Sequence, residues 1–378
     1  MSLRNRHRGR AAVVSATRYR MPAEWEPHAA TLLAWPHETT DWPGKFAAIK
    51  WVYVEIVRHL HLNEQVVILV NSLKQKQNAS QVLQKGAVDL GRVRFYRVPT
   101  DRGWMRDAGP IGIIRNANMY FADWHFNGWA KYDDWRSDDA VAGRLAKNMK
   151  VRRIMPRARN RRIVLEGGSV DVNGVGSLLT TEQCMLSTKQ ARNPHLDRED
   201  LEVVFAKYLG ARNILWLADG IVGDDTHGHV DDIARFVDPR TVVVAVESNR
   251  GDDNYAPTHE NLRRLKKMRD QSGRRIRIVT LPMPAPLSFD GTRLPASYAN
   301  FYIANKLVIV PTFNDPADRV ALRTLDRLFP GRTVVGIHCV DLVLGLGTLH
   351  CLTQQIPGVS SRKAGDASRK VAKAQSKK

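Results

Sequence analysis

The sequence predicts an α/β fold assembled from five degenerate helix–strand units, which gives the chain a pseudosymmetric architecture. Four segments share one local pattern, in which a helix-like stretch ends at a turn with glycine and arginine and a β-branched strand follows. The intervals between their glycines are 119, 63 and 58 residues, and a fifth strand-like stretch, KVRRIMPRARNRRIVL, lies near the middle of the longest interval. The four glycines are Gly91, Gly210, Gly273 and Gly331.

Glycine suits the end of each predicted helix because it adopts the left-handed backbone conformation at little cost. Loops rich in Gly, Asp, Asn and Trp fall between the units, and loops on a repeated scaffold often carry binding groups. We therefore expect one such loop from each unit to converge on a central cavity. Their sequences are DRGWMRDAGP, DWHFNGWAKYDDW, LEGGSVDVNGVG, DGIVGDDTHGHVDD and GLGTLHC.

Composition restricts the class of protein. The 378-residue chain is 43% hydrophobic and 25% charged, as in soluble globular proteins, and no apolar run is long enough to cross a membrane, which excludes a transmembrane protein. Its three cysteines are an odd number without CxxC spacing, which argues against a disulfide framework and a structural zinc site. Free thiols fit a reducing compartment, and we expect a cytoplasmic location.

The net charge of +20 is concentrated at the two ends of the chain. Residues 1–20 carry six arginines and no acidic residue, and the segment from Ser360 onward carries seven Lys or Arg against one Asp. We therefore expect a basic disordered arm over 1–20, a catalytic domain over 21–357 and a basic disordered tail over 358–378. The first segment also resembles a transit peptide, and a third interpretation is that it precedes a true start at Met21.

The basic charge raises the alternative of an RNA-binding scaffold, because a positive field attracts phosphate. That alternative predicts salt-sensitive binding that disappears when both tails are removed. The body is only modestly basic and lacks a basic–aromatic motif such as an RNP sequence. We therefore expect no nucleic-acid partner beyond non-specific contact by the tails.

The segment GLGTLHC places Cys351 directly after a histidine and a glycine-rich turn. The preceding RTVVGIHCVDLVL is apolar and β-branched, which predicts a buried strand that ends just before this turn. A thiol at such a place is a candidate nucleophile, and the alternative is a small buried hydrophobe. Cys184 and Cys339 stand in strand-like contexts, where we expect inert core thiols.

Two carboxylates stand in loops that a ligand can approach. Asp107 in GWMRDAGP follows Trp104 and Arg106, and a local ion pair with Arg106 is the alternative to a binding role. Glu166 ends an apolar strand-like stretch before two glycines, which allow a ligand close to the backbone; a buried, paired acid is the alternative. Trp104 and Trp129 are candidates for the wall of a channel that attracts cations.

The segment THGHVDDIARFV holds His229 and Asp231 two residues apart at the start of a predicted strand, so we expect both side chains on one face. His227 would share that face if the strand extended back. The HxHxD spacing then permits a Zn or Mn site and hence a metal-dependent hydrolase. The loop-like DDTHG argues against a rigid strand of ligands, so the metal site is the alternative interpretation.

The candidates together are one thiol, one histidine and three carboxylates, all from glycine-bounded loops. A planar, cationic substrate explains this combination, because carboxylates hold a guanidinium by bidentate hydrogen bonds. The cysteine then supplies a nucleophile, and the histidine supplies an acid or base.

From about Met21 to Pro357 the chain resembles the agmatine deiminase and bacterial peptidyl-arginine deiminase family of guanidino-group-modifying enzymes. The resemblance implies a five-bladed α/β propeller with pseudo-fivefold symmetry around one active-site channel. It also implies hydrolysis of agmatine to N-carbamoylputrescine and ammonia, a step of putrescine and polyamine synthesis, with peptidyl-arginine or free arginine as alternative substrates. The matching segments are MPAEWEPHAATLLAWP, DRGWMRDAGP, FNGWAKYDDW, LEGGSVDVNGVGSLLTTEQC, NPHL, GHVDDIARF, NYAPTHENLRRL, LPMP, SYANFYIAN, VIVPTF, FPGRTVVGI and LHCLTQQIP.

The same resemblance assigns roles to the candidate residues. It implies that Cys351 is the nucleophile, that Asp107 and Asp231 grip the guanidinium, and that Glu166 and His229 transfer protons. The expected intermediate is a covalent thiouronium on Cys351, for which neither a metal nor an organic cofactor is required. Family members are commonly dimers or larger, so the expected partners are a small guanidino cation and further copies of the chain.

Two segments depart from the family pattern. The family usually has Gly-Gly-Asn-Ile before the His-Cys pair, whereas this chain has GLGTLHC with Leu346, Thr348 and Leu349. The segment WPHETTDWPG also lacks the usual Arg and Asn after WP. These differences leave the guanidinium clamp intact and are expected to affect the region around the substrate tail.

Overall fold

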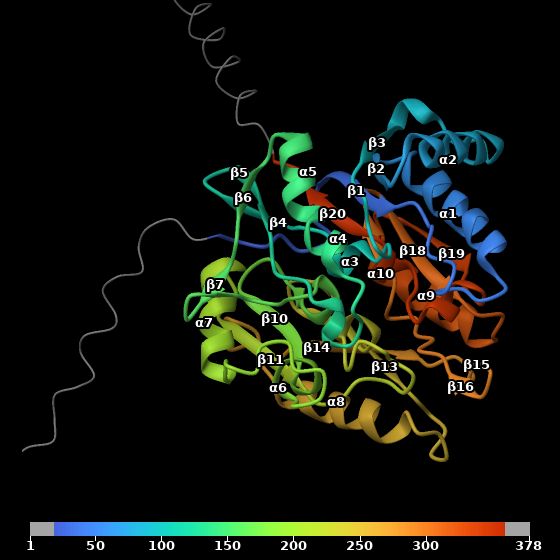
Figure 1. Cartoon of the computed structure of the whole chain (residues 1–378). Helices are drawn as coiled ribbons and strands as arrows, with labels where there is room; N and C mark the ends of the chain where they lie inside the picture. The colour runs from blue at the N-terminus through green and yellow to red at the C-terminus, as the bar shows by residue number, and fades with distance from the viewer. Residues whose placement is uncertain (1–18, 360–378) are drawn as a thin grey trace, which may run out of the picture.

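The computed structural model describes residues 19–359 (Figure 1). The predicted arm and tail therefore lie outside the described residues, except for the few positions next to the body. The body begins slightly before the predicted boundary at residue 21, because Arg20 exchanges backbone hydrogen bonds of 2.9 and 2.8 Å with Ile114. At the other end, Gly358 donates a backbone hydrogen bond of 2.7 Å to Pro27, one residue past the predicted boundary at 357.

Five sheets of three or four strands share one topology in the part of the chain that the structure describes. In each sheet two strands pair antiparallel, and the chain then crosses over through helical segments to a strand that pairs parallel. Four of the sheets consist of β4 (Ile111–Arg115), β5 (Asn118–Ala122) and β6 (Arg152–Ile154); β9 (Asp171–Val172), β10 (Ser177–Thr181) and β11 (Asn213–Leu217); β12 (Ala234–Asp238), β13 (Thr241–Val246) and β14 (Arg277–Pro282); and β17 (Tyr302–Ala304), β18 (Leu307–Thr312) and β19 (Thr333–His338).

The remaining sheet joins the two ends of the body (Figure 1). The strand β20 (Gln354–Pro357) pairs antiparallel with β1 (His28–Ala34), which continues through α1 (Phe46–Leu60) to its parallel neighbour β2 (Gln65–Val70). The last strand of the body therefore pairs with the first, and Cys351 lies just before this junction. The chain then crosses over again through α2 (Leu73–Lys85) and η1 (Leu90–Arg92) to β3 (Val93–Arg97), which pairs parallel with β2.

The predicted repeat is present, but the expectation that a left-handed glycine ends each helix holds only in part. The turns at Gly210, Gly273 and Gly331 each lead into the parallel edge strand of a sheet, and Gly91 lies directly before β3. Only Gly210 and Gly273 have a left-handed backbone, with φ of +74° and +75°. At the fifth turn Lys150 takes that conformation instead, with φ of 57°, so the position does not demand glycine.

The crossover helices form because apolar residues recur on one face and polar groups cap their ends. The side chain of Ser72 caps α2 by accepting from the N–H of Gln75. At the start of the helix Arg198–Tyr208 (α7), the side chains of Asp197 and Asp200 each accept from the backbone N–H of the other residue, which forms a capping box. The further crossover helices are α5 (Val141–Met149), α7 (Arg198–Tyr208), α8 (Tyr255–Lys267) and α9 (Ala317–Leu328).

Strands such as QVVILV and TVVVAV are buried along almost their whole length, as expected when a sheet is covered on both faces. No helix within residues 19–359 has the length and apolar character needed to cross a bilayer. The short elements are α3 (Met105–Ala108), α4 (Arg136–Asp139), α6 (Glu182–Leu186), α10 (Leu349–Leu352), η2 (Gly128–Ala130), η3 (Gly167–Ser169), η4 (Val230–Asp232), η5 (Leu342–Gly345), β7 (Arg157–Ala158), β8 (Arg161–Arg162), β15 (Ser288–Phe289) and β16 (Thr292–Arg293). Three of the candidate site residues lie in these short elements: Asp107 in α3, Asp231 in η4 and Cys351 in α10.

Candidate active site

One pocket of about 200 Å³ brings together side chains from loops of several units. Cys351 and Asp107 belong to its lining, as do both candidate tryptophans. The convergence expected from the sequence is therefore present for these residues. The lining residues are Thr40, Asp41, Arg102, Trp104, Asp107, Trp129, Tyr132, Asp225, Thr226, Leu344, Gly345, Leu346, Gly347 and Cys351.

Cys351 lies in the short helix α10, not at the end of a strand as predicted. The strand β19 ends at His338, and the rest of the apolar stretch turns into η5. The glycines before Cys351 allow close packing: a Cβ added at Gly347 would lie 2.8 Å from Trp104 Cζ3 and 3.2 Å from Cys351 Sγ. Only a residue without a side chain lets Trp104 and the thiol lie this close together.

The surroundings of Cys351 favour the neutral thiol when no cation is bound. The thiol is buried, and Asn300 Nδ2 donates to Sγ at 3.0 Å. Asp231 Oδ2 lies 3.7 Å from Sγ. Burial and the negative charges of Asp231, Asp232 and Asp107 raise the pKa of Cys351 well above its usual value. A bound cation would oppose these effects and favour the thiolate.

Asp107 is buried in α3 and is not the local partner of Arg106. Its Oδ1 accepts from the N–H of Gly168, and its Oδ2 accepts from Trp129 Nε1, both at 3.0 Å. Burial raises the pKa of Asp107 to about 6, partly offset by the nearby His229. The adjacent arginine turns away from it, because Arg106 binds Glu24 instead.

Gly168 explains how three candidate side chains reach one point. A Cβ added at this residue would lie 2.6 Å from His229 Nδ1, 2.9 Å from Asp107 Oδ1 and 3.0 Å from Asp231 Oδ2. The bare backbone leaves room for the three groups, of which Asp107 comes from one loop and the His229–Asp231 pair from another. Of the two glycines after Glu166, Gly168 thus allows this close approach of side chains, whereas Gly167 packs against Arg106.

His229 and Asp231 do not start a strand as predicted. Asp231 lies in the 3₁₀ turn η4 and His229 is the N-cap of this turn, while β12 begins only at Ala234. Both side chains nevertheless point at Gly168. His229 Nδ1 lies 3.8 Å from Asp107 Oδ1, and its Nε2 lies 3.9 Å from Glu166 Oε2, which are charge contacts rather than hydrogen bonds.

The environment of His229 favours the imidazolium. Burial alone would lower the pKa of this histidine, but Asp107, Cys184 and Glu166 outweigh burial and raise it well above the usual value. Within residues 19–359 neither ring nitrogen has a hydrogen-bond partner. The ring is therefore charged and free to exchange a proton with a ligand.

Glu166 is a fully buried carboxylate at the cap of η3, and the apolar stretch before it is not a strand of the described sheets. Arg192 Nε donates to its Oε1 at 3.0 Å. Burial would raise the pKa of Glu166, but Arg192 and His229 lower it to about 2. This carboxylate is thus permanently ionised and keeps its other oxygen toward the histidine.

The set of His227, His229 and Asp231 on which the metal-dependent hydrolase depends does not form. His227 contacts Ser187 Oγ at 3.0 Å through Nε2, and it belongs to no group of three metal-ligating side chains in the described part of the chain. The ligand-like groups that do occur combine Glu166, Cys184 and His229, and Asp231, Asp232 and Cys351.

The other thiols and aromatic residues differ in their relation to the site. Cys339 is buried as predicted, and so is Cys184, but Cys184 touches the catalytic candidates instead of ordinary core. Trp104 and Trp129 both line the pocket, and Trp104 Nε1 donates to Asp41 at 3.1 Å. Asn127 caps η2 by accepting from the N–H of Ala130.

The outer part of the pocket is also acidic. Asp41 and Asp225 line it together with a single cationic side chain, Arg102, which bonds Asp41 at 2.6 Å. Tyr132 Oη donates to Asp225 at 2.5 Å, and the half-exposed Lys131 also pairs with this aspartate. The lining therefore holds three aspartates, Asp41, Asp107 and Asp225, against one arginine, and cations partly neutralise Asp41 and Asp225.

Sequence reasoning missed Glu24, Arg192, Asn300 and His350. Glu24, Asn300 and His350 lie in segments that match the family, and Arg192 directly precedes one, but no spacing distinguishes these residues from core residues. For a charged residue such as Glu24, the available signal was a charge next to apolar residues, which requires a partner when it is buried. The partners come from distant parts of the chain, as with Arg192 and Glu166.

Comparisons with known proteins agree with this geometry. The family model described as Porphyromonas-type peptidyl-arginine deiminase matches residues 20–357. An agmatine deiminase of Pseudomonas aeruginosa is 35% identical over 365 residues, which cover 90% of this chain and 95% of that protein. An agmatine deiminase of Stutzerimonas stutzeri is likewise 35% identical, over 364 residues, with the same coverage.

Solved structures give the same result. The agmatine deiminase of Enterococcus faecalis is similar with a TM-score of 0.83 and 31% identity, covering 91% of this chain and 98% of that one. A substrate-bound agmatine deiminase of C. jejuni has a TM-score of 0.81 and 29% identity, with coverage of 91% and 98%. The predicted five-bladed α/β propeller, the pentein fold, is thereby confirmed.

Proposed function

Because the chain belongs to the Porphyromonas-type peptidyl-arginine deiminase family, we propose that it hydrolyses agmatine to N-carbamoylputrescine and ammonia. The observation that carries the proposal is a pocket lined by the candidate thiol and one candidate carboxylate, with the candidate histidine and the two other carboxylates buried in contact with them. An imidazolium beside buried carboxylates supplies acid and base chemistry, and the thiol supplies a nucleophile. Agmatine provides the matching cation.

Substrate binding begins with the guanidinium. Asp107 and Asp231 accept hydrogen bonds from its nitrogens and hold its carbon near Cys351 Sγ, which lies 3.7 Å from Asp231 Oδ2. The bound cation increases the fraction of enzyme whose thiol has lost its proton to solvent. Trp104 and Trp129 form the walls of the pocket around the alkyl chain.

The chemistry then proceeds in two halves. The thiolate of Cys351 attacks the guanidinium carbon and forms the S–C bond. His229 donates a proton to one amino nitrogen, the C–N bond breaks, and ammonia leaves from a thiouronium. Water adds to the same carbon and gives one proton to His229. The S–C bond then breaks to release the thiolate, and the hydroxyl proton of the departing ureido product passes to solvent. Glu166 holds the imidazolium in place through both steps.

The charge of the outer pocket favours agmatine over free arginine. Agmatine ends in an ammonium group, which is attracted to Asp225 and Asp41. Free arginine would bring its carboxylate toward the same two aspartates. Peptidyl-arginine lacks the terminal ammonium and needs space for a chain, whereas the pocket volume is about 200 Å³.

A substrate panel tests the proposal. Purified enzyme is given agmatine, arginine and an arginyl peptide at equal concentrations, and ammonia release is measured together with the mass of each product. We expect agmatine to have the highest kcat/KM, with a product in which one imino group has become a carbonyl. Turnover that favours arginine or the peptide would contradict the substrate assignment, and loss of activity on chelation with insensitivity to thiol alkylation would contradict the reaction.

The proposal also includes a cellular location, an oligomeric state and a metabolic role. The chain would act in the cytoplasm as a homo-oligomer, within the synthesis of putrescine and polyamines. The acidic pocket supports a small cationic ligand but bears on neither location nor assembly. Both stay predictions, for which size-exclusion chromatography with light scattering and fractionation of cells are the direct measurements.

A further inference from the structure

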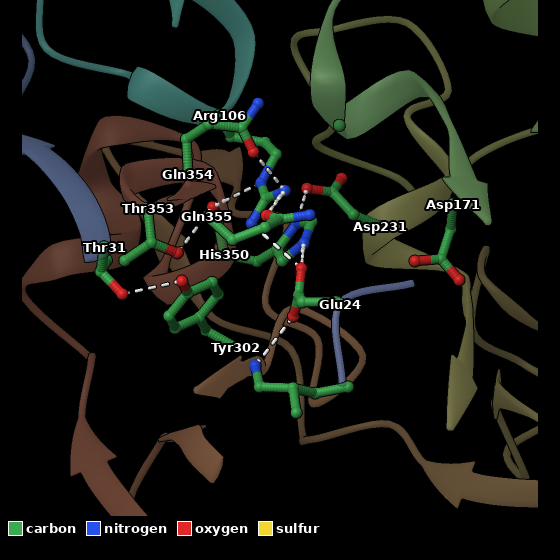
Figure 2. Close-up of polar contacts among 12 residues, drawn as sticks. Glu24, Thr31, Arg106, Asp171, Asp231, Tyr302, His350, Thr353, Gln354 and Gln355 are labelled. Carbon is green, nitrogen blue, oxygen red and sulfur yellow. Dashed lines mark hydrogen bonds and ion pairs between the residues drawn. The ribbon is translucent and has the colours of Figure 1, made fainter. Parts of the chain in front are cut away.

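The histidine next to the nucleophile sits in a bridge between two buried carboxylates (Figure 2). His350 Nδ1 lies 2.7 Å from Asp231 Oδ2, and His350 Nε2 lies 2.8 Å from Glu24 Oε2. All three side chains are buried. A neutral imidazole has only one N–H, so its other nitrogen would face a carboxylate with a lone pair. Both contacts are favourable only when the ring is an imidazolium.

Charge balance in this cluster leads to the same protonation state. Arg235 pairs with Glu24 and with Asp171 at 2.9 and 3.0 Å, and Arg106 pairs with Glu24 at 3.1 Å. Three carboxylates therefore face two guanidinium groups, and a charged His350 makes the buried cluster neutral. The titratable or charged groups around the ring are Glu24, Asp171, Asp231, Arg106, Arg235 and Cys351.

Glu24 is held rigidly, so the bridge has a fixed end. Its Oε1 accepts from the N–H of Ile303 at 2.8 Å, in addition to its contacts with Arg106, Arg235 and His350. Burial opposes ionisation of Glu24, but Arg235, His350 and Arg106 hold its pKa well below the usual range. Glu24 thus presents Oε2 to His350 Nε2 from a fixed position, at 2.8 Å.

The bridge leaves one oxygen of Asp231 available. His350 occupies Oδ2, whereas Oδ1 has no hydrogen-bond partner within residues 19–359 although it is buried. Burial would raise the pKa of Asp231, but the hydrogen bond and charge of His350 lower it. An ionised carboxylate with one fixed and one free oxygen is the arrangement that a guanidinium N–H requires.

We propose that His350, held as an imidazolium by Glu24, is a positioning residue that fixes and ionises Asp231 for the guanidinium and offsets the negative charge beside Cys351. His350 acts through Asp231 and need not touch the substrate. The inference rests on the proposed function, because Asp231 serves as a clamp only for a cationic substrate.

Three variants test the role. His350→Gln keeps an N–H donor but removes the positive charge, and Glu24→Gln removes the charge at the far end of the bridge without touching Asp231. The control is His61→Gln, because His61 is also a buried histidine but bonds only the backbone oxygen of Val57 at 3.0 Å within α1. For each variant, kcat/KM for agmatine and the alkylation rate of Cys351 by iodoacetamide, read from its peptide mass, are measured against pH.

We expect His350→Gln to lower kcat/KM by about 10- to 100-fold, the scale of one charge-assisted hydrogen bond. The acid limb of its pH profile should move to higher pH, because Asp231 then loses the group that lowers its pKa. Alkylation of Cys351 should also require higher pH, because the charge of Asp231 is no longer offset. Glu24→Gln should change both profiles in the same direction, and His61→Gln should change neither.

The two readouts separate this inference from the proposed function. If the unmodified enzyme is inactive on agmatine, the proposed function fails, but the alkylation profiles still decide the role of His350. Reduced activity in His350→Gln and Glu24→Gln with unmoved acid limb and alkylation profile would mean a purely structural role and would overturn the inference. Should His350→Gln fail to fold, Glu24→Gln gives the same decision.

Discussion

Cys351 Sγ lies 3.7 Å from Asp231 Oδ2, so the proposed nucleophile and one arm of the proposed guanidinium clamp are direct neighbours. The contact makes the thiol hard to ionise in the free enzyme, because Asp231 adds to the effect of burial in raising the pKa of Cys351. The same contact places the guanidinium carbon beside the thiol once Asp231 holds the substrate. Substrate binding and activation of the nucleophile are thereby coupled.

Replacing this aspartate should separate reactivity from turnover. In Asp231→Asn the negative neighbour is gone, so we expect iodoacetamide to alkylate Cys351 faster at pH 8, while kcat/KM for agmatine falls by about 100-fold or more with the loss of the clamp. The exposed Asp290 provides a control, since Asp290→Asn should change neither rate. Slower alkylation in Asp231→Asn would contradict the electrostatic account.

The pH dependence of substrate binding should follow Asp107, whose pKa burial raises to about 6. Only the ionised carboxylate attracts the guanidinium, so binding is complete above this pKa and is lost as pH falls through it. We expect the KM for agmatine to rise steeply below about pH 6, and to rise about tenfold for each further pH unit. Initial rates between pH 5 and 8 measure this, and a KM that stays constant down to pH 5 would rule out Asp107 as the titrating clamp.

The ion pair between Glu166 and Arg192 should contribute strongly to stability as well as to activity. Both side chains are 0% exposed, so Glu166→Ala leaves a buried guanidinium without its carboxylate. Removing one partner of a buried pair costs about 3–5 kcal/mol in the free energy of unfolding, which urea denaturation measures. Glu260 forms comparable pairs with Arg263 and Arg264 at the surface, and Glu260→Ala should change stability far less. Equal effects at both sites would show that burial of the pair is unimportant.

A single methyl group at Gly347 should damage the site. The added Cβ would lie 2.8 Å from Trp104 Cζ3 and 3.0 Å from Cys351 Cβ, so either the indole or the thiol must move. We expect Gly347→Ala to destabilise the protein by about 1–3 kcal/mol and to reduce kcat/KM by more than about tenfold. Gly331→Ala is the matched control, because nothing lies within 4 Å of a Cβ there. Wild-type activity in Gly347→Ala would show that this packing does not position Cys351.

Much of the fold follows from local sequence, and the reason is visible in the repeat. Each unit ends with a short turn into a β-branched strand, as at Gly273 before β14, and such signals need no distant partner. The exception at Lys150 is also local, because its backbone takes the left-handed conformation that glycine was expected to supply. Because the same turn and strand pattern recurs along the chain, several weak local signals together predict the repeated fold.

The site was predicted in its residue types but not in its geometry. Cys351 was expected at a turn directly after a strand and the His229–Asp231 pair at the start of one, whereas short helical turns hold these positions, because apolar character alone does not distinguish a buried turn from a buried strand. A local ion pair of Arg106 with Asp107 was the alternative interpretation, yet the partners of Arg106 include Glu24 and Gln354, which are 82 and 248 positions away. Polar contacts over such separations depend on the closed ring of units, which no local pattern describes.

The most direct test of the account is to trap the intermediate. Enzyme turning over agmatine is quenched in acid, and the peptide that contains Cys351 is analysed by mass spectrometry, with Cys351→Ala treated in parallel. The account predicts an N-alkylthiouronium adduct that retains the alkyl chain of agmatine, on Cys351 and on neither Cys184 nor Cys339, and no ammonia release from the variant. Ammonia release by Cys351→Ala at the wild-type rate would contradict nucleophilic catalysis by this thiol.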